Sequence, residues 1–227
     1  MQESVIFSLV IFDCDGVLVD SEMLSASVLM RMMADVGLPI TAEIFREDFL
    51  GRSFATAAKR AEARFGCNLP GDFQLRYRRE LLARMEHHLK PMAGVEEVLR
   101  SLAVPMCLAT SSSPERLEMS MRVTGLAPWF EGKSYTASQV TNGKPAPDLC
   151  LHAASAMGCE PSTCLVIEDS EMGILAAQAA GMRVWHFAGG AHMKSGNHLP
   201  DHVVPDRVVH SMPDLLHALQ ECGMCRA

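Results

Sequence analysis

The sequence lacks the features that mark membrane proteins and nucleic-acid-binding proteins. No apolar run in its 227 residues approaches the roughly 20 residues needed to cross a bilayer. The net charge is −7 and no long basic run occurs, so we expect neither a membrane nor a nucleic-acid partner. The N-terminal segment carries an acidic residue, Glu3, and runs into an apolar segment without the basic flank of a signal peptide. These absences predict a cytoplasmic protein.

The cysteines do not form the framework of a small secreted domain. The chain has eight of them but is large, and disulfide scaffolds are typical of short extracellular domains. Cys14, Cys107 and Cys164 lie in or beside apolar runs, which predicts small buried hydrophobic side chains. Cys222 and Cys225 form a CxxC near the C-terminal end, but no further zinc ligands and no following helix accompany it. We therefore assign no function to that pair.

The histidines show no recognisable metal-binding pattern. None of the nine has His-x-x-x-His spacing on a clear helix. The stretch 189–200 begins with two glycines and ends with a proline, which is typical of a surface loop. We expect His192 and His198, which lie in it, to be solvated.

The most informative pattern present is a pair of acids after an apolar run. Residues 5–12 read as a buried strand and are followed by Asp13-Cys14-Asp15-Gly16. Both carboxylates, and the carbonyl between them, can face one crevice if the chain bends as it leaves the sheet. Two close acids repel, so a cation such as Mg²⁺ or a shared proton is expected. The alternative for this piece alone is an acidic turn.

Other apolar runs end in chemically useful residues. The run 105–109 ends in Thr110 and three serines, and the run 165–167 ends in Glu168 and Asp169. Between them, the turn 142–145 carries Lys144. Such a set can bind a phosphate and a divalent metal together. Taken singly, Lys144 is also consistent with a solvated turn lysine, and the acid pair with a helix N-terminus that favours acids.

The order of predicted elements gives the fold class. Residues 21–89 contain no convincing strand and are expected to form four helices at 22–36, 41–49, 53–65 and 72–88, with Thr41 as an N-cap. From residue 94 onward, helices at 95–102, 114–123, 148–157, 171–180 and 213–222 alternate with strands near 106, 165, 183–187 and 207–210. This alternation predicts an α/β fold with a doubly wound, mainly parallel sheet and an inserted helical block.

At this level of detail the chain resembles the haloacid dehalogenase-type phosphohydrolases. The four motifs of that family match, in order, at residues 13–18 (DCDGVL), Thr110, 144–148 (KPAPD) and 167–170 (IEDS). The resemblance covers nearly the whole chain and is nearest to the subgroup of β-phosphoglucomutase, phosphoglycolate phosphatase and 6-phosphogluconate phosphatase. It implies a Rossmann-like core at 1–17 and 90–227 and a small helical cap domain at 18–89.

The resemblance also implies roles for the residues of the four motifs. Asp13 would be the nucleophile that forms an aspartyl-phosphate, and Asp15 the general acid and then the base. Thr110 through its hydroxyl and Ser111 through its backbone N–H would bind the phosphoryl oxygens, and Lys144 would neutralise their charge. The implied ligands of a Mg²⁺ cofactor are the following: Asp13, the carbonyl of Asp15, Asp169 and Glu168.

Substrate choice is expected to depend on the cap. Arg52 matches the family's specificity loop in position, and Arg76, Arg78 and Arg79 on the last cap helix could reach a second phosphate or a carboxylate. A solvated helix face is the alternative for each arginine. Glu22 is expected near the cap hinge, with no chemical role assigned.

Three functions fit these observations. The first is a Mg²⁺-dependent phosphatase of a small phosphorylated metabolite, such as a sugar phosphate or 6-phosphogluconate, acting as a monomer or weak homodimer. The second is a phosphoglucomutase, which uses the same residues. The third is an inactive binding protein on this fold, although no motif residue is missing. Dehalogenase chemistry does not need Asp15, and phosphonatase chemistry needs a cap lysine, for which Lys59 and Lys90 have no motif support.

Overall fold

Six parallel strands form a single sheet in the order β3-β2-β1-β4-β5-β6. The computed structural model of the chain describes residues 7–49, 54–195 and 199–226. The strand bounds are β1 Leu9–Phe12, β2 Met106–Thr110, β3 Ser134–Thr136, β4 Cys164–Glu168, β5 Arg183–Phe187 and β6 Arg207–Val209. The chain runs from β1 outward to β3 and then crosses to β4 on the other side of β1. Ligand crevices in such sheets lie at this switch point.

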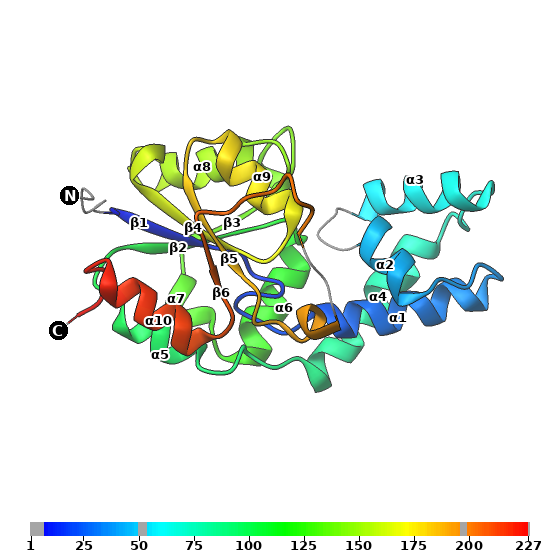
Figure 1. Cartoon of the computed structure of the whole chain (residues 1–227). Helices are drawn as coiled ribbons and strands as arrows, with labels where there is room; N and C mark the ends of the chain where they lie inside the picture. Colours follow the sequence, from blue (N-terminus) through cyan, green and yellow to red (C-terminus); the bar gives the residue numbers. More distant parts are fainter. Residues whose placement is uncertain (1–6, 50–53, 196–198, 227) are drawn as a thin grey trace.

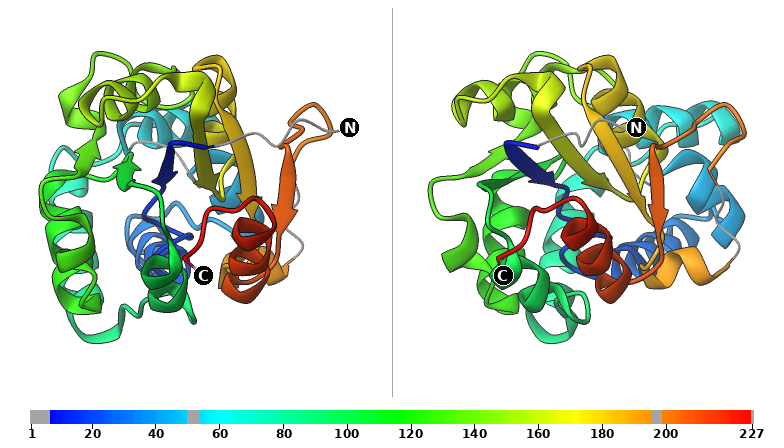
Figure 2. Two further views of the ribbon diagram at one scale, coloured as in Figure 1. Left: turned by 90° about the vertical axis from the view of Figure 1, so that its left-hand side faces the viewer. Right: turned by 60° about the vertical axis from the view of Figure 1, so that its left-hand side comes forward.

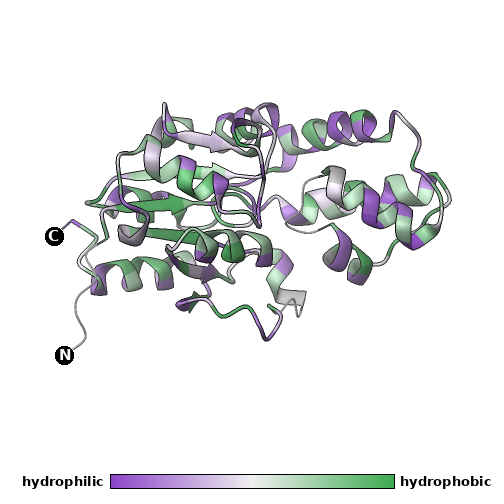
Figure 3. Cartoon of the chain, turned by 90° about the horizontal axis from the view of Figure 1, so that it is seen from above, coloured by the Kyte–Doolittle hydropathy of each residue, from purple (hydrophilic) through white to green (hydrophobic). Residues whose placement is uncertain are grey.

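The alternation of side chains along β1 explains why the strand is apolar throughout. Leu9 and Ile11 belong to one hydrophobic cluster, and Val10 and Phe12 to the other, on the opposite face. A parallel strand covered on both faces is expected to be a continuous apolar run. Figure 3 shows the strands of the sheet mostly in the hydrophobic colours.

Helices cover both faces of the sheet (Figures 1 and 2). On one face lie α8 (Asp148–Ala156) and α9 (Glu171–Ala179), and on the other α5 (Val95–Ser101), α6 (Pro114–Thr124), α7 (Ala127–Phe130) and α10 (Met212–Glu221). This arrangement confirms the predicted doubly wound parallel sheet. The short strand β3 and the one-turn helix α7 were not predicted, because segments of three or four residues carry too little periodicity. No helix of the described residues is long and apolar enough to span a membrane.

The four helices predicted between β1 and α5 lie together at one end of the molecule and are called the cap below (Figure 1). They are α1 (Glu22–Asp35), α2 (Ala42–Asp48), α3 (Phe54–Phe65) and α4 (Phe73–His88). Thr41 is the N-cap of α2, as predicted, and its side chain accepts a hydrogen bond from the N–H of Ile44 at 3.2 Å.

The chain enters and leaves the cap along two paired segments. The N–H of Asp20 donates to the carbonyl of Lys90 at 3.1 Å, and the N–H of Met92 donates to the carbonyl of Leu18 at 2.8 Å. Two antiparallel connections side by side can act as one hinge. The predicted domain limits at residues 17/18 and 89/90 lie beside this pairing and stay a prediction.

Candidate active site

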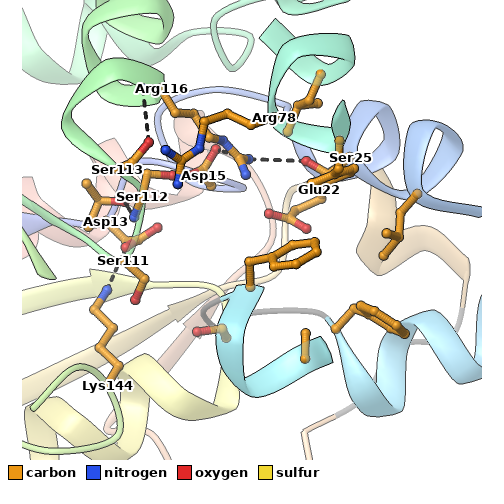
Figure 4. Close-up of a pocket in the computed structure, with 18 of the residues that line it drawn as sticks. Asp13, Asp15, Glu22, Ser25, Arg78, Ser111, Ser112, Ser113, Arg116 and Lys144 are labelled. Carbon is orange, nitrogen blue, oxygen red and sulfur yellow. Dashed lines mark hydrogen bonds and ion pairs between the residues drawn. The ribbon is translucent and has the colours of Figure 1, made fainter. Parts of the chain in front are cut away.

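The carboxyl ends of β1, β2 and β4 bring the motif residues to one place. These strands are neighbours in the sheet, and Asp13 follows β1, while Thr110 and Glu168 end β2 and β4. The N–H of Asp13 still donates to the carbonyl of Ile167 at 2.9 Å, so the sheet holds this residue in register. Lys144 reaches the same point from the loop before α8, as Figure 4 shows. The structure therefore joins residues that are up to 155 positions apart.

A buried lysine lies between the carboxylates of Asp13 and Glu168. Its Nζ is 2.5 Å from Oδ1 of Asp13 and 2.7 Å from Oε2 of Glu168, and it also donates to the carbonyl of Ala109 at 3.2 Å. The side chain of Lys144 is only 3 % exposed. Although burial opposes it, the two carboxylates raise the pKa of Lys144, so the lysine stays charged. The solvated-turn alternative for Lys144 is thus wrong.

The acids of this cluster repel one another. Burial, followed by the charge of Glu168, raises the pKa of Asp13 well above its usual value. Burial also raises the pKa of Asp169 to about 6, against the opposing effect of His192, whose Nε2 is 3.1 Å from Oδ2 of Asp169. Asp13 and Glu168 share one lysine, and the third acid, Asp169, lies beside a histidine, so the cluster favours a further cation.

The same three acids fit a divalent metal ion. Asp13, Glu168 and Asp169 each offer a carboxylate oxygen, and these oxygens lie within 4.8 Å of one another. Hard oxygen donors are the ligands that Mg²⁺ prefers. Gly16 is needed beside them, because a Cβ on it would lie 1.7 Å from Oδ2 of Asp169. A glycine is also needed at position 173, because a Cβ there would lie 2.0 Å from the carboxyl carbon of Glu168.

Asp15 has different surroundings from Asp13. Nη2 of Arg116 lies 2.6 Å from Oδ1 of Asp15, and the hydroxyls of Ser21 and Ser112 donate to the same carboxylate at 2.5 Å each. Burial alone would raise the pKa of Asp15, but the charge of Arg116 and the serine hydrogen bonds outweigh it and hold the pKa below its usual value. Arg116 also donates to Ser25 of the cap at 3.2 Å. The surroundings therefore lower the pKa of Asp15 but raise that of Asp13, two residues earlier in the same motif.

The loop after β2 supplies hydroxyl groups at the base of a cavity. Thr110 is buried, its hydroxyl accepts a hydrogen bond from the N–H of Ser112 at 3.1 Å, and Ser111 lines the same cavity. The N-cap Ser113 and Pro114 at the first position start α6 directly afterwards. Oxygens of a phosphoryl group at Asp13 would meet this loop and Lys144.

A cavity of about 380 Å³ lies between these core residues and the cap. On the cap side it is lined by the following residues: Glu22, Ser25, Leu29, Phe45, Phe49, Phe54, Ala57, Gln74, Tyr77, Arg78, Leu81 and Leu82. Glu22 is thus more than a hinge residue, since its carboxyl faces the cavity, and burial raises its pKa to about 7.

The structure separates the predicted cap arginines. Arg78 lines the cavity, whereas Arg76 is exposed and is not among the described residues that line it. Residues two apart on a helix point in nearly opposite directions, while Gln74, Arg78 and Leu81 follow the spacing of one face. The prediction for Arg52 lies outside the described residues.

One histidine prediction was wrong. His192 is not solvated but buried, 7 % exposed, and it pairs with Asp169. It lies in the short 3₁₀ segment Ala191–Ser195, and its ring packs against Gly16 of the first motif. His198 lies outside the described residues. Cys14, Cys107 and Cys164 are buried, as predicted.

Sequence reasoning missed Arg116, Ser112, Ser21 and Ser25 as site residues. Arg116 did carry a signal, because it lies in the first turn of a helix that starts directly after the strand ending at Thr110. A side chain at that position is directed back towards the strand ends.

Comparisons with known proteins agree with this geometry. Residues 7–181 match the family model described as haloacid dehalogenase-like hydrolase. The chain is 27% identical over 186 residues to the 6-phosphogluconate phosphatase of Escherichia coli, covering 82% of this chain and 84% of that protein. It is 34% identical over 182 residues to a probable pseudouridine-5′-phosphatase of Drosophila melanogaster, covering 77% and 78%.

A solved structure matches the whole fold. It is a haloacid dehalogenase-like protein of unknown function from Agrobacterium tumefaciens, with a TM-score of 0.81 and 35% identity, over 96% of this chain and 99% of that one. The match includes both the sheet and the cap, because it covers nearly the full length.

Proposed function

The chain belongs to the haloacid dehalogenase-like hydrolases, and we propose that within this family it is a Mg²⁺-dependent phosphatase of a small phosphorylated metabolite, acting through an aspartyl-phosphate. The observation that carries the proposal is the buried cluster of Asp13, Glu168, Asp169 and Lys144 at the strand ends. Relatives named as phosphatases of phosphorylated metabolites support the same reading.

In the first half-reaction, an oxygen of Asp13 attacks the phosphorus atom and the ester bond breaks. Lys144 and the loop of Thr110 and Ser111 face the phosphoryl oxygens and stabilise the charge that they carry. Asp15 gives a proton to the leaving oxygen, so the leaving group departs as an alcohol. Because Arg116 and the serine hydrogen bonds lower the pKa of Asp15, the carboxylate first takes up this proton from solvent.

In the second half-reaction, Asp15 acts as a base. It takes a proton from a water molecule, whose oxygen attacks the phosphorus atom, and the bond between phosphorus and Asp13 breaks. Inorganic phosphate leaves and Asp13 is regenerated. The contacts of Asp15 seen here, with one guanidinium and two hydroxyl donors, suit this ionised state.

Asp13, Glu168 and Asp169 would hold the metal ion, together with the carbonyl of Asp15. When bound, Mg²⁺ supplies positive charge that offsets the repulsion between the carboxylates and the phosphoryl group. In its absence Lys144 is the cation that keeps Asp13 in place.

The leaving group is expected to be small, because the cavity holds about 380 Å³. A sugar phosphate is our proposal for the compound class, supported by the bacterial relative named 6-phosphogluconate phosphatase.

The test is phosphate release from a panel of phosphorylated metabolites, with Mg²⁺ and with EDTA. We expect release from one or a few compounds in Mg²⁺ and none in EDTA. Asp13→Asn should abolish release, with Asp35→Asn, an exposed residue on α1, as the matched control. Full activity of Asp13→Asn would contradict the aspartyl-phosphate. Conversion of β-glucose 1-phosphate to glucose 6-phosphate without phosphate release would favour the mutase, which uses the same residues.

A further inference from the structure

The side of the cavity formed by the cap, called the cap wall below, is more apolar than the binding of a simple polyol would require. Its apolar members come from all four cap helices or their ends, namely Leu29, Phe45, Phe49, Phe54, Ala57, Leu81 and Leu82. Each hydroxyl of a sugar or sugar acid loses its water on entering such a cavity and needs a hydrogen-bond partner in return. An apolar wall cannot supply these partners.

The polar groups of the cap wall are few. Gln74, Tyr77 and Arg78 lie on α4, and Glu22 and Ser25 lie on α1. Ser25 already accepts a hydrogen bond from Arg116. The cap can therefore bind only a small number of polar substituents. Most of the side chains that could bind them lie on α4.

The charges of the cavity also argue against a second anionic group on the substrate. Of the described lining cations, Lys144 is paired with Asp13 and Glu168, and Arg116 is paired with Asp15. Arg78 is the remaining cation of the described lining. The carboxyl of Glu22 faces the same space, and its negative charge offsets the positive charge of Arg78.

Aromatic side chains on the cap wall form a place for a flat ring. Phe54 and Tyr77 stack with their ring centroids 5.4 Å apart and an interplanar angle of 27°. Both are half-buried and line the cavity, whereas Phe45 and Phe49 are 6% and 7% exposed and mostly serve the cap interior. Partly exposed aromatic rings favour other aromatic rings through stacking and edge contacts.

We propose that the substrate's leaving group carries an aromatic or heteroaromatic ring, which packs against Phe54 and Tyr77 while its phosphoryl group lies at Asp13. The inference rests on the proposed phosphatase function. It narrows the compound class, because a nucleoside monophosphate is a sugar phosphate with such a ring. The sugar then lies between the polar strand ends and the cap, and the ring lies on the apolar wall.

The test compares two ring-bearing compounds with two ring-free ones, of which uridine 5′-monophosphate and ribose 5-phosphate differ only in carrying a base or a hydroxyl on C1 of the ribose. Uridine 5′-monophosphate and ribose 5-phosphate are measured for kcat/KM of phosphate release in Mg²⁺, together with flavin mononucleotide and 6-phosphogluconate. We expect at least one ring-bearing compound to exceed both ring-free compounds by about tenfold or more. Phe54→Leu keeps an apolar side chain but removes the ring, and should bring the ratio between the ring-bearing and ring-free compounds towards one. Tyr77→Leu should act in the same direction.

Leu75→Ala is the control, because Leu75 lies on α4 but is 60% exposed and is not among the described lining residues. Thermal unfolding of each variant shows whether it is folded. Equal rates on both classes, or faster release from 6-phosphogluconate, would overturn the ring inference and leave the phosphatase in place. Release from none of the four compounds, while other phosphate esters are hydrolysed, would also overturn it. Metal-dependent release from no phosphate ester at all would overturn the proposed function, and the ring inference with it.

Discussion

The core side and the cap side of the cavity differ in the kind of side chains that line them. The core side gathers three buried carboxylates, one lysine and a loop with hydroxyl groups at the ends of the strands. The cap side is mainly apolar, and it is carried by helices that join the core through two paired connections. The comparison teaches that the charged groups lie where the sheet fixes their positions, whereas the apolar wall is built on a different set of helices.

Lys144→Met should have the largest effect, because it removes the one cation shared by Asp13 and Glu168. We expect kcat to fall by about 10³-fold, since the transferring group loses a charge contact. The metal-free protein should lose about 3–5 kcal/mol of unfolding free energy, because two buried carboxylates lose their partner. Steady-state kinetics and urea unfolding measure both effects. Lys90→Met, at an exposed position, is the control, and equal losses in the two variants would contradict the assignment.

Arg116→Met tests whether the proposed proton transfer by Asp15 depends on its ion pair with Arg116. Without Arg116, Asp15 loses its ion pair and Ser25 loses a contact that links core and cap. We expect kcat to fall by about 10²-fold with a smaller change in KM, because proton transfer is affected more than binding. Arg116→Lys should restore part of kcat. Arg122→Met, on the same helix but exposed, should change neither parameter.

Asp169→Asn should weaken metal binding more than it changes the fold. We expect the Mg²⁺ concentration for half-maximal activity to rise at least tenfold, since one of three carboxylate donors is lost. Removal of a repelling buried charge should leave the metal-free protein at least as stable as the wild type. Titration of activity with Mg²⁺ and thermal unfolding in EDTA measure the two effects. An unchanged Mg²⁺ requirement would remove Asp169 from the ligand set.

Glu22→Gln should have the smallest effect, and only on stability. The carboxyl of Glu22 has a pKa of about 7 in the folded state against its ordinary value of 4.5 in the unfolded chain, so its ionisation opposes folding. The wild type should therefore lose stability relative to Glu22→Gln as the pH rises from about 4.5 to 7, and the difference should stay constant above that. A gain on the order of 2 kcal/mol at pH 8 is expected for the variant, and none at pH 4.

Urea unfolding in EDTA at both pH values measures the effect of Glu22→Gln. Glu43→Gln, in the first turn of α2 and exposed, is the matched control. A gain of equal size at both pH values would show that the carboxyl of Glu22 does not titrate in the folded cavity.

Local patterns in the sequence were sufficient to predict most of the strands and helices of this protein. The apolar runs before Asp13 and Glu168 predicted β1 and β4, because strands covered on both faces must be apolar throughout. The regular spacing and capping residues of the long helices predicted their positions, as at Thr41. Short elements such as β3 were missed, since three residues do not establish a period.

The sequence by itself determined the parallel α/β sheet, the inserted helices and the order of the motif residues, because each depends on the pattern within one segment. Only the tertiary structure decided that Arg116 pairs with Asp15 across 101 positions, that His192 is buried beside Asp169, and that Arg78 faces the cavity while Arg76 does not. These facts depend on which segments pack together and on how each helix is rotated. Contacts between distant segments leave no periodic trace in a single sequence.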